Sequence, residues 1–258
     1  MWPFKKKAFL DNGVAEWHVN NMCWLIKNLY HTPMFQETRL VLPSAGYFKS
    51  EKEGHEFAVD ILDQVKTYAG MQEWQITLEG DKQAYEQSKY ELIQMPSEKM
   101  PLGMFINNHA NGALIIYNPG ILKDPVSLVA TMAHELSHYL IHAIHDDLPC
   151  DDDEEEFLTD QVACFLGFGV FMANNVFHFD QWRDDATGVQ GWKSQRRGYL
   201  PEADLVFNLA LFLEMKNIAP DEAAACLKPH LAKQLKAAIA DMPKWRGRLQ
   251  DALAAVQG

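Results

Sequence analysis

The segment from Pro125 to His145 constrains this chain more than any other, because it predicts a long helix that is buried along one face. Asp124 and Pro125 form a helix start in which the aspartate caps free amides and the proline occupies the first turn. Apolar residues recur at helical spacing and supply the buried stripe: Leu128, Val129, Met132, Leu136 and Leu140. The rest of the chain must therefore provide a core for this helix.

The same helix contains the motif His134-Glu135-Leu136-Ser137-His138, which has the form HExxH. Residues four apart lie one turn up the same helical face, so both imidazoles can point at one metal ion while Glu135 reaches a water bound to it. Neutral imidazole is a good zinc ligand, and zinc with three protein ligands lowers the pKa of its water to about 7. The motif therefore predicts a metal site on this helix.

A third protein ligand must come from another segment, and the next predicted helix offers Glu156-Phe157-Leu158-Thr159-Asp160, in which two acids share a face. HELSH followed by this ExxxD resembles the gluzincin metallopeptidases, including the compact minigluzincin and ImmA-like branch, over about residues 124 to 175. The resemblance implies two helices that face each other across zinc. It also implies a role for each matching residue: His134, His138 and Glu156 as ligands, Glu135 as general base, and Asp160 as the acceptor that orients a ligand histidine.

Neighbouring acids compete for the third ligand position. Glu156 ends an acidic run that begins at Asp151, so Glu154 and Glu155 are rival ligands; neither has an aspartate four residues later. The run itself is expected to be a solvated loop and helix N-terminus, where negative charge is favourable, with a calcium site as the alternative.

The spacing of the histidines limits the ligand set. Seventeen residues separate His138 from Glu156, which fits a short turn between two helices, and no third-histidine motif of the metzincin kind follows. His142 lies on the ligand face, but its backbone is about 12 Å along the helix from that of His134. We therefore expect His142 to lie outside the ligand set.

Peptide hydrolysis also needs a hydrogen-bond donor for the oxyanion that forms on the attacked carbonyl. The glycine-marked segment from Gly191 to Leu200 offers Tyr199, Arg196 and Arg197, and His178 is a further candidate. Tyr199 is our choice as the second catalytic residue. The alternative is that the aromatic residues pack the turn and the arginines pair with surface acids.

Around these helices the sequence predicts an α+β fold, with a small mixed or antiparallel sheet followed by a mostly helical half that carries the HExxH helix and a facing ExxxD helix. A strand over Gln75 to Leu78 precedes two apolar runs, Met104 to Ile106 and Ala113 to Tyr117, which predict a hairpin. An extended peptide could add to the hairpin edge at Ala113 to Tyr117. Further helices are expected at Val14 to His31, Phe57 to Gly70, Glu155 to Asn174, Pro201 to Lys216, and Pro220 to near the C-terminus with a break around Met242-Pro243.

The order of these elements suggests two parts, an N-terminal α+β part (1–120) whose hairpin edges a cleft and a helical zinc-binding part (121–258). We expect the two to form one integrated catalytic domain. The chain has 258 residues, 48% of them hydrophobic, which is enough for one large core or for two closely packed subdomains. Gly167 and Gly169 in the apolar helix predict close helix packing.

Charge and apolar runs bear on partners and location. The chain has 35 acidic and 23 basic residues and a net charge of -12, which would repel a phosphate backbone and disfavours nucleic acid as a partner. The basic N-terminal cluster lacks a signal-peptide apolar core, and the apolar stretch from Val162 to Ala173 is shorter than the ~20 residues that span a bilayer. We expect a cytoplasmic protein without a membrane partner. The four cysteines form no CxxC pair and are expected to be free thiols.

These observations favour a zinc-dependent peptidase that hydrolyses a peptide or protein substrate through a metal-activated water, with Glu135 as general base. One alternative is a zinc-stabilised regulatory or protein-binding module without turnover. The other is a helical protein that binds no metal. The sequence indicates neither the substrate nor the oligomeric state.

Overall fold

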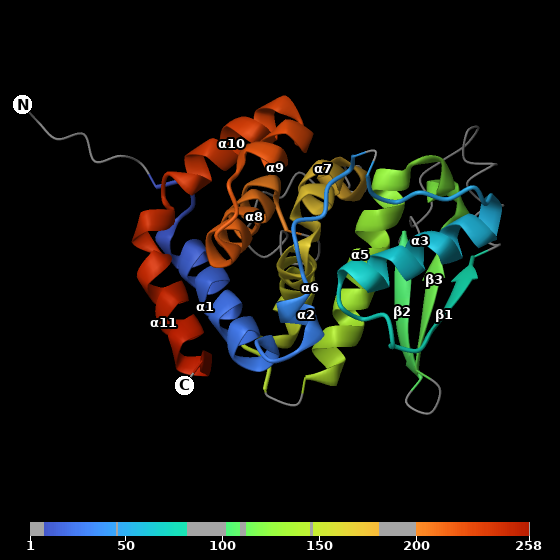
Figure 1. Cartoon of the computed structure of the whole chain (residues 1–258), viewed down its shortest axis with the longest axis horizontal. Helices are drawn as coiled ribbons and strands as arrows, with labels where there is room; N and C mark the ends of the chain where they lie inside the picture. The colour runs from blue at the N-terminus through green and yellow to red at the C-terminus, as the bar shows by residue number, and fades with distance from the viewer. Residues whose placement is uncertain are drawn as a thin grey trace, which may run out of the picture.

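Helices form most of the chain, and a small sheet lies at one side of them (Figure 1). The computed structural model describes residues 8–44, 46–81, 102–108, 112–144, 147–180 and 200–257. The described helices are α1 (Asn12–Leu29), α2 (Pro33–Gln36), α3 (Gly54–Tyr68), α5 (Pro125–Ala143), α6 (Glu155–Ala163), α7 (Gly169–Asp180), α8 (Glu202–Lys216), α9 (Asp221–Cys226), α10 (Pro229–Ile239) and α11 (Arg246–Gln257). The strands are β1 (Ile76–Gly80), β2 (Gly103–Asn108) and β3 (Gly112–Tyr117). The predicted α+β class is confirmed.

Among the described residues, the sheet has three strands in the order β1-β3-β2, with β1 parallel to β3 and β2 antiparallel to it. The predicted hairpin is therefore present as β2 and β3. The predicted free edge at Ala113 to Tyr117 is wrong, because β3 lies in the centre and pairs on both sides. The outer strand of the hairpin is β2. The sequence of the hairpin alone could not show this, because it depends on the pairing of β3 with β1, which comes from a distant part of the chain.

Helix α5 lies between the sheet and most of the other helices, in contact with β2 on one side and with α6 and α7 on the other (Figure 1). Its first turn is capped by Asp124, whose Oδ1 accepts hydrogen bonds from the backbone N–H groups of Val126 and Ser127 at 3.1 and 3.2 Å. The predicted apolar stripe is fully buried along its length: Leu128, Val129, Met132, Leu136 and Leu140. The motif residues are thus held on a helix that core packing fixes in place.

The helix predicted over Glu155 to Asn174 is interrupted at a π-helical turn, Cys164–Phe168, between α6 and α7. Gly167 has a φ of +97°, which only glycine adopts without strain, and its carbonyl accepts a hydrogen bond from the N–H of Val41 at 3.0 Å. A Cβ on Gly167 would lie 2.1 Å from the carbonyl oxygen of Arg39. The kink therefore allows the segment that contains Arg39 and Val41 to approach the backbone at Gly167. Gly169 packs closely against Leu209 of α8, as the sequence predicted.

The C-terminal region has one break more than predicted, between α9 and α10. Lys228 has φ -55° and ψ 146°, which is the extended conformation usual for a residue before proline, here Pro229. The predicted break at Met242-Pro243 is a short helical turn, Met242–Lys244.

One hydrophobic core cluster includes side chains from α1 and α3 as well as from α5, α8 and α11. Within the described residues, the helical stretch Asp152–Asn175 is the one that is long and apolar enough to cross a membrane. However, 89% of its apolar window is buried inside the protein. Its apolar side chains therefore belong to the core, and its helices α6 and α7 pack against α5.

Candidate metal centre

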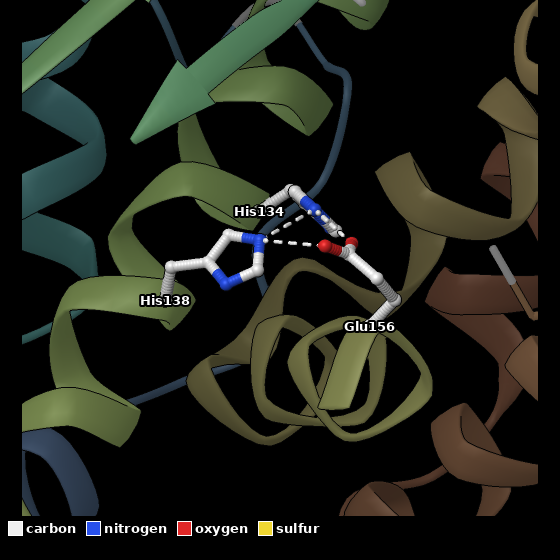
Figure 2. Close-up of side chains that lie close together, drawn as sticks. All are labelled: His134, His138 and Glu156. Carbon is white, nitrogen blue, oxygen red and sulfur yellow. Dashed lines mark hydrogen bonds and ion pairs between the residues drawn. The ribbon is translucent and has the colours of Figure 1, made fainter. Parts of the chain in front are cut away.

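Two histidines of α5 and one glutamate of α6 bring their side chains to one point (Figure 2). The Nε2 atoms of His134 and His138 lie 3.2 Å apart. Oε2 of Glu156 lies 3.3 Å from Nε2 of His134, and Oε1 of Glu156 lies 3.6 Å from Nε2 of His138. The arrangement follows from the spacing of four along α5 and from the packing of the first turn of α6 against that helix.

These separations fit a metal ion. Ligand atoms about 2.0–2.2 Å from one ion at tetrahedral angles lie about 3.3–3.6 Å from each other. The distance between the two Nε2 atoms and the distance from each of them to one Glu156 oxygen are close to this range, and all three ligand atoms lie within 4.8 Å of one another. Two imidazole nitrogens with one carboxylate oxygen are a donor set that divalent metals accept. The structure therefore contains a cluster that could hold a metal ion.

The cluster is open to solvent on the side of Glu156. The Glu156 side chain is 54% exposed, whereas that of His134 is 4% exposed. Three protein ligands also leave one position of a four-coordinate ion free, which is the arrangement of catalytic rather than structural zinc sites. A water or a substrate atom can therefore reach an ion held there.

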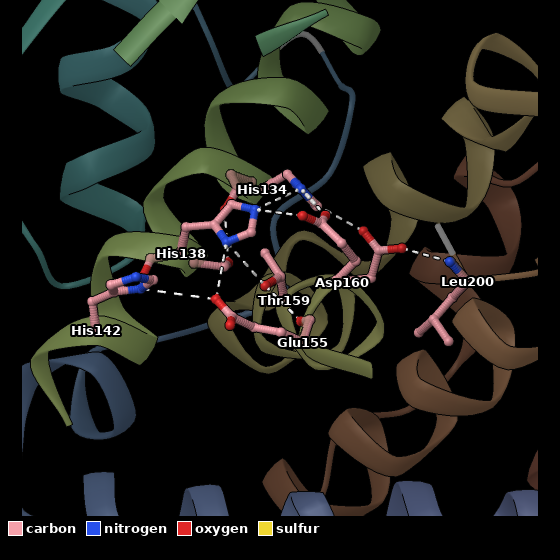
Figure 3. A network of polar contacts seen from close by, with 10 residues as sticks. His134, His138, His142, Glu155, Thr159, Asp160 and Leu200 are labelled. Carbon is pink, nitrogen blue, oxygen red and sulfur yellow. Dashed lines mark hydrogen bonds and ion pairs between the residues drawn. The ribbon is translucent and has the colours of Figure 1, made fainter. Parts of the chain in front are cut away.

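His134 is held from behind by Asp160. Nδ1 of His134 donates to Oδ1 of Asp160 at 2.9 Å, and Oδ2 of Asp160 accepts from the backbone N–H of Leu200 at 2.7 Å (Figure 3). His134 and Asp160 are both buried. Because the Nδ1 proton is used in this bond, Nε2 is left to face the cluster. Asp160 thus lies where the resemblance placed it, and the histidine that it contacts is His134.

His138 has a corresponding partner in Thr159, which the sequence reasoning missed. The Thr159 hydroxyl donates its single hydrogen to the carbonyl oxygen of Glu155 at 2.9 Å, and its Oγ1 lies 3.3 Å from Nδ1 of His138 (Figure 3). Since that hydrogen is already used, Oγ1 must accept from the Nδ1–H of His138. Thr159 is next to Asp160 in the sequence, on a helix expected to face α5, and this position could have indicated that it contacts a ligand histidine.

The rival acids do not join the cluster. The nearest carboxylate oxygen of Glu155 lies 3.9 Å from Nδ1 of His138, on the side of the ring away from the cluster. Glu154 accepts a hydrogen bond from the indole of Trp17 at 3.1 Å. The ring of His142 is turned away as expected, with its Nδ1–H donating to the carbonyl oxygen of His138 at 3.0 Å. The geometry selects Glu156 as the third member of the cluster.

Burial and charge pairing shift the pKa values of the cluster. Burial alone would lower the pKa of His134, but its hydrogen bonds to Asp160 and Glu156 outweigh burial and raise the pKa to about 10. Burial would raise the pKa of Glu156, but its contacts with the two histidines hold it well below the usual range. A metal ion must displace the proton that this pairing retains, so the metal affinity of the cluster falls as the pH falls.

Glu135 lies next to this cluster and is itself buried. Burial raises the pKa of its carboxyl group, and the nearby histidines partly oppose this. A carboxyl group with a raised pKa beside a metal-capable cluster is suited to taking a proton and returning it.

Tyr199, Arg196 and Arg197, the sequence candidates for an oxyanion donor, lie outside the described residues, as does the side chain of His178. The nearest described residue in the chain is Leu200, which is tied to Asp160.

Comparison with protein-family models, with curated proteins and with solved structures gave no significant match. The chemistry of the cluster therefore has to be argued from its own geometry.

Proposed function

We propose that this protein is a zinc-dependent peptidase of the gluzincin type that acts on a peptide or protein substrate in the cytoplasm. The observation that carries the proposal is the cluster of His134, His138 and Glu156, whose ligand atoms lie within 4.8 Å of one another and could hold one metal ion. Glu135 supports catalysis rather than a structural metal site, since holding a metal does not require a buried carboxyl group at that position.

Zinc bound at this cluster would polarise a substrate carbonyl and lower the pKa of a bound water to about 7. The carboxylate of Glu135 takes a proton from the attacking water and returns it to the leaving amine. Asp160 and Thr159 keep the two imidazoles in the orientation that presents Nε2 to the ion.

The position of β2 supports an extended peptide as the substrate. β2 is the outer strand of the hairpin and lies along α5, with the Phe105 ring 6.1 Å from that of His138 and nearly parallel to it. Met104 and Ile106, two residues of the same strand, are 44% and 40% exposed. A peptide that adds to an outer strand is held by backbone hydrogen bonds, and here its path runs beside the cluster.

The first test is the zinc content of the purified protein, measured by elemental analysis for the wild type, Glu156→Gln and Glu155→Gln. The two variants lose the same charge at adjacent positions. We expect about one zinc per chain in the wild type and in Glu155→Gln, and a clear loss in Glu156→Gln. A wild type that binds no zinc after reconstitution overturns the proposal.

The second test is cleavage of a mixed peptide library, followed by mass spectrometry. We expect cleavage by the zinc-loaded wild type and none after chelation. A protein that retains zinc but cleaves no peptide would instead favour a zinc-stabilised binding module.

A further inference from the structure

The carboxylate of Glu135 differs from the neighbouring side chains in its lack of a hydrogen-bond partner among the described residues. His134, His138 and Asp160 each have a hydrogen-bond partner behind the cluster. Glu135 is 4% exposed, yet among the described residues no hydrogen bond to its carboxylate is present. Its position must therefore be set by packing.

The packing partner is the backbone of β2 at Gly103. A Cβ on Gly103 would lie 2.4 Å from Oε1 of Glu135 and 2.9 Å from its Cδ, closer than Cβ atoms approach other heavy atoms. It would also lie 2.7 Å from the Cγ2 methyl of Thr131, which is one turn before Glu135 on α5. β2 thus crosses α5 at the carboxylate of Glu135. This close approach is possible only because Gly103 has no side chain.

The backbone conformation of Gly103 does not require glycine, since it is not among the residues with positive φ. Glycine in a strand weakens the strand, and it is found where another group approaches the backbone closely. The close approach of Glu135 is therefore the physical reason for glycine at this position.

The contact can be relieved at Glu135 more easily than at the strand. Gly103 pairs with Tyr117 of β3, and the carbonyl of the preceding Leu102 accepts a hydrogen bond from the N–H of Asn118 at 3.0 Å. These pairings hold β2 in place, whereas Oε1 is the far end of a flexible side chain. An added Cβ would therefore displace the carboxylate.

We propose that Gly103 is a positioning residue that sets the place of the Glu135 carboxylate beside the metal cluster. The proposal rests on the proposed function, because it concerns the general base of that reaction. A displacement of about 1 Å at a reacting group costs about 100-fold in rate.

The test is the double variant Gly103→Ala/Thr131→Ala, compared with Thr131→Ala alone. Thr131→Ala removes the methyl group that the new Cβ would otherwise meet, so Glu135 remains the main obstacle. Gly247→Ala is the matched glycine control, because a Cβ there meets nothing within 4 Å. Each variant is assayed for zinc content, thermal unfolding, kcat and KM.

We expect the double variant to retain one zinc per chain and the unfolding temperature of Thr131→Ala, to keep KM within a few-fold, and to lose about 100-fold in kcat. A kcat within a few-fold of that of Thr131→Ala overturns the proposal. A loss of zinc or of folded protein in the double variant also overturns it, since the contact would then be structural.

A crystal structure of the double variant gives a result that does not depend on activity. We expect the Glu135 carboxylate to be displaced and β2 to remain in place; displacement of β2 with Glu135 unmoved overturns the proposal. If the wild type cleaves no peptide, the proposed function fails, while this crystal structure still decides whether Gly103 positions Glu135.

Discussion

Asp160 joins His134 to Leu200, which lies forty residues after Asp160 in the chain. One of its carboxylate oxygens accepts from Nδ1 of His134 at 2.9 Å and the other from the backbone N–H of Leu200 at 2.7 Å. Both oxygens are thus occupied by donors, and a neutral replacement cannot satisfy both.

Asp160→Asn is expected to weaken zinc binding by about 10- to 100-fold. In either orientation of the amide, its NH₂ group faces one of the two donors, so one buried N–H loses its acceptor. That loss costs about 1–3 kcal/mol of stability. Zinc affinity is measured by competition with a chromogenic chelator, and stability by urea denaturation. Asp63→Asn, on the exposed side of α3, is the control for the change in charge. Unchanged zinc affinity in Asp160→Asn would contradict the role given to this contact.

Thr159→Val removes the acceptor of the His138 Nδ1–H and keeps the shape of the side chain. Because that N–H loses its acceptor in a partly buried position, the ring loses its fixed orientation, and we expect zinc affinity to fall about 10-fold. Thr159→Ser retains the oxygen and should restore most of the affinity. The same chelator competition measures all three proteins, and equal loss in the serine variant would show that the methyl group matters instead.

Glu135→Gln separates the chemistry from the metal site. Glutamine has nearly the same shape as glutamate but cannot take a proton, so we expect one zinc per chain and a fall in kcat of about 10² to 10⁴. Elemental analysis and the peptide assay check the two parts separately. Retained turnover would exclude Glu135 as the general base.

The parts of the site that could be predicted from sequence are those set by local geometry. His134 and His138 are one turn apart, and Asp160 is one turn from Glu156, so any helix through them puts each pair on a common face. The same helical geometry places Thr159 near Asp160, but its contact with His138 also depends on which face of α6 meets α5.

Other features depend on contacts between distant segments. Gly103 matters because β2 lies against Glu135, and β2 is the outer strand because β1 pairs with β3. Neither fact is encoded in spacing along the chain, and for this reason the predicted peptide edge was assigned to the wrong strand. The choice of Tyr199 as oxyanion donor stays a prediction, since that residue is outside the described part of the chain.

Gly167 offers a test of the fold that leaves the site residues intact. Alanine there must adopt a φ of +97° and bring its Cβ to 2.1 Å from the carbonyl oxygen of Arg39, which is backbone and cannot rotate away. Strain and overpacking of this kind each cost about 1–3 kcal/mol, so we expect Gly167→Ala to lose about 2–6 kcal/mol of stability in urea denaturation. Gly247→Ala, with open space around the new Cβ, should be close to neutral. The fraction of Gly167→Ala that stays folded should still bind one zinc per chain, because the kink lies beyond the turns of α6 that carry Glu156 and Asp160. A stable Gly167→Ala protein would mean that the segment at Arg39 can move away from the kink.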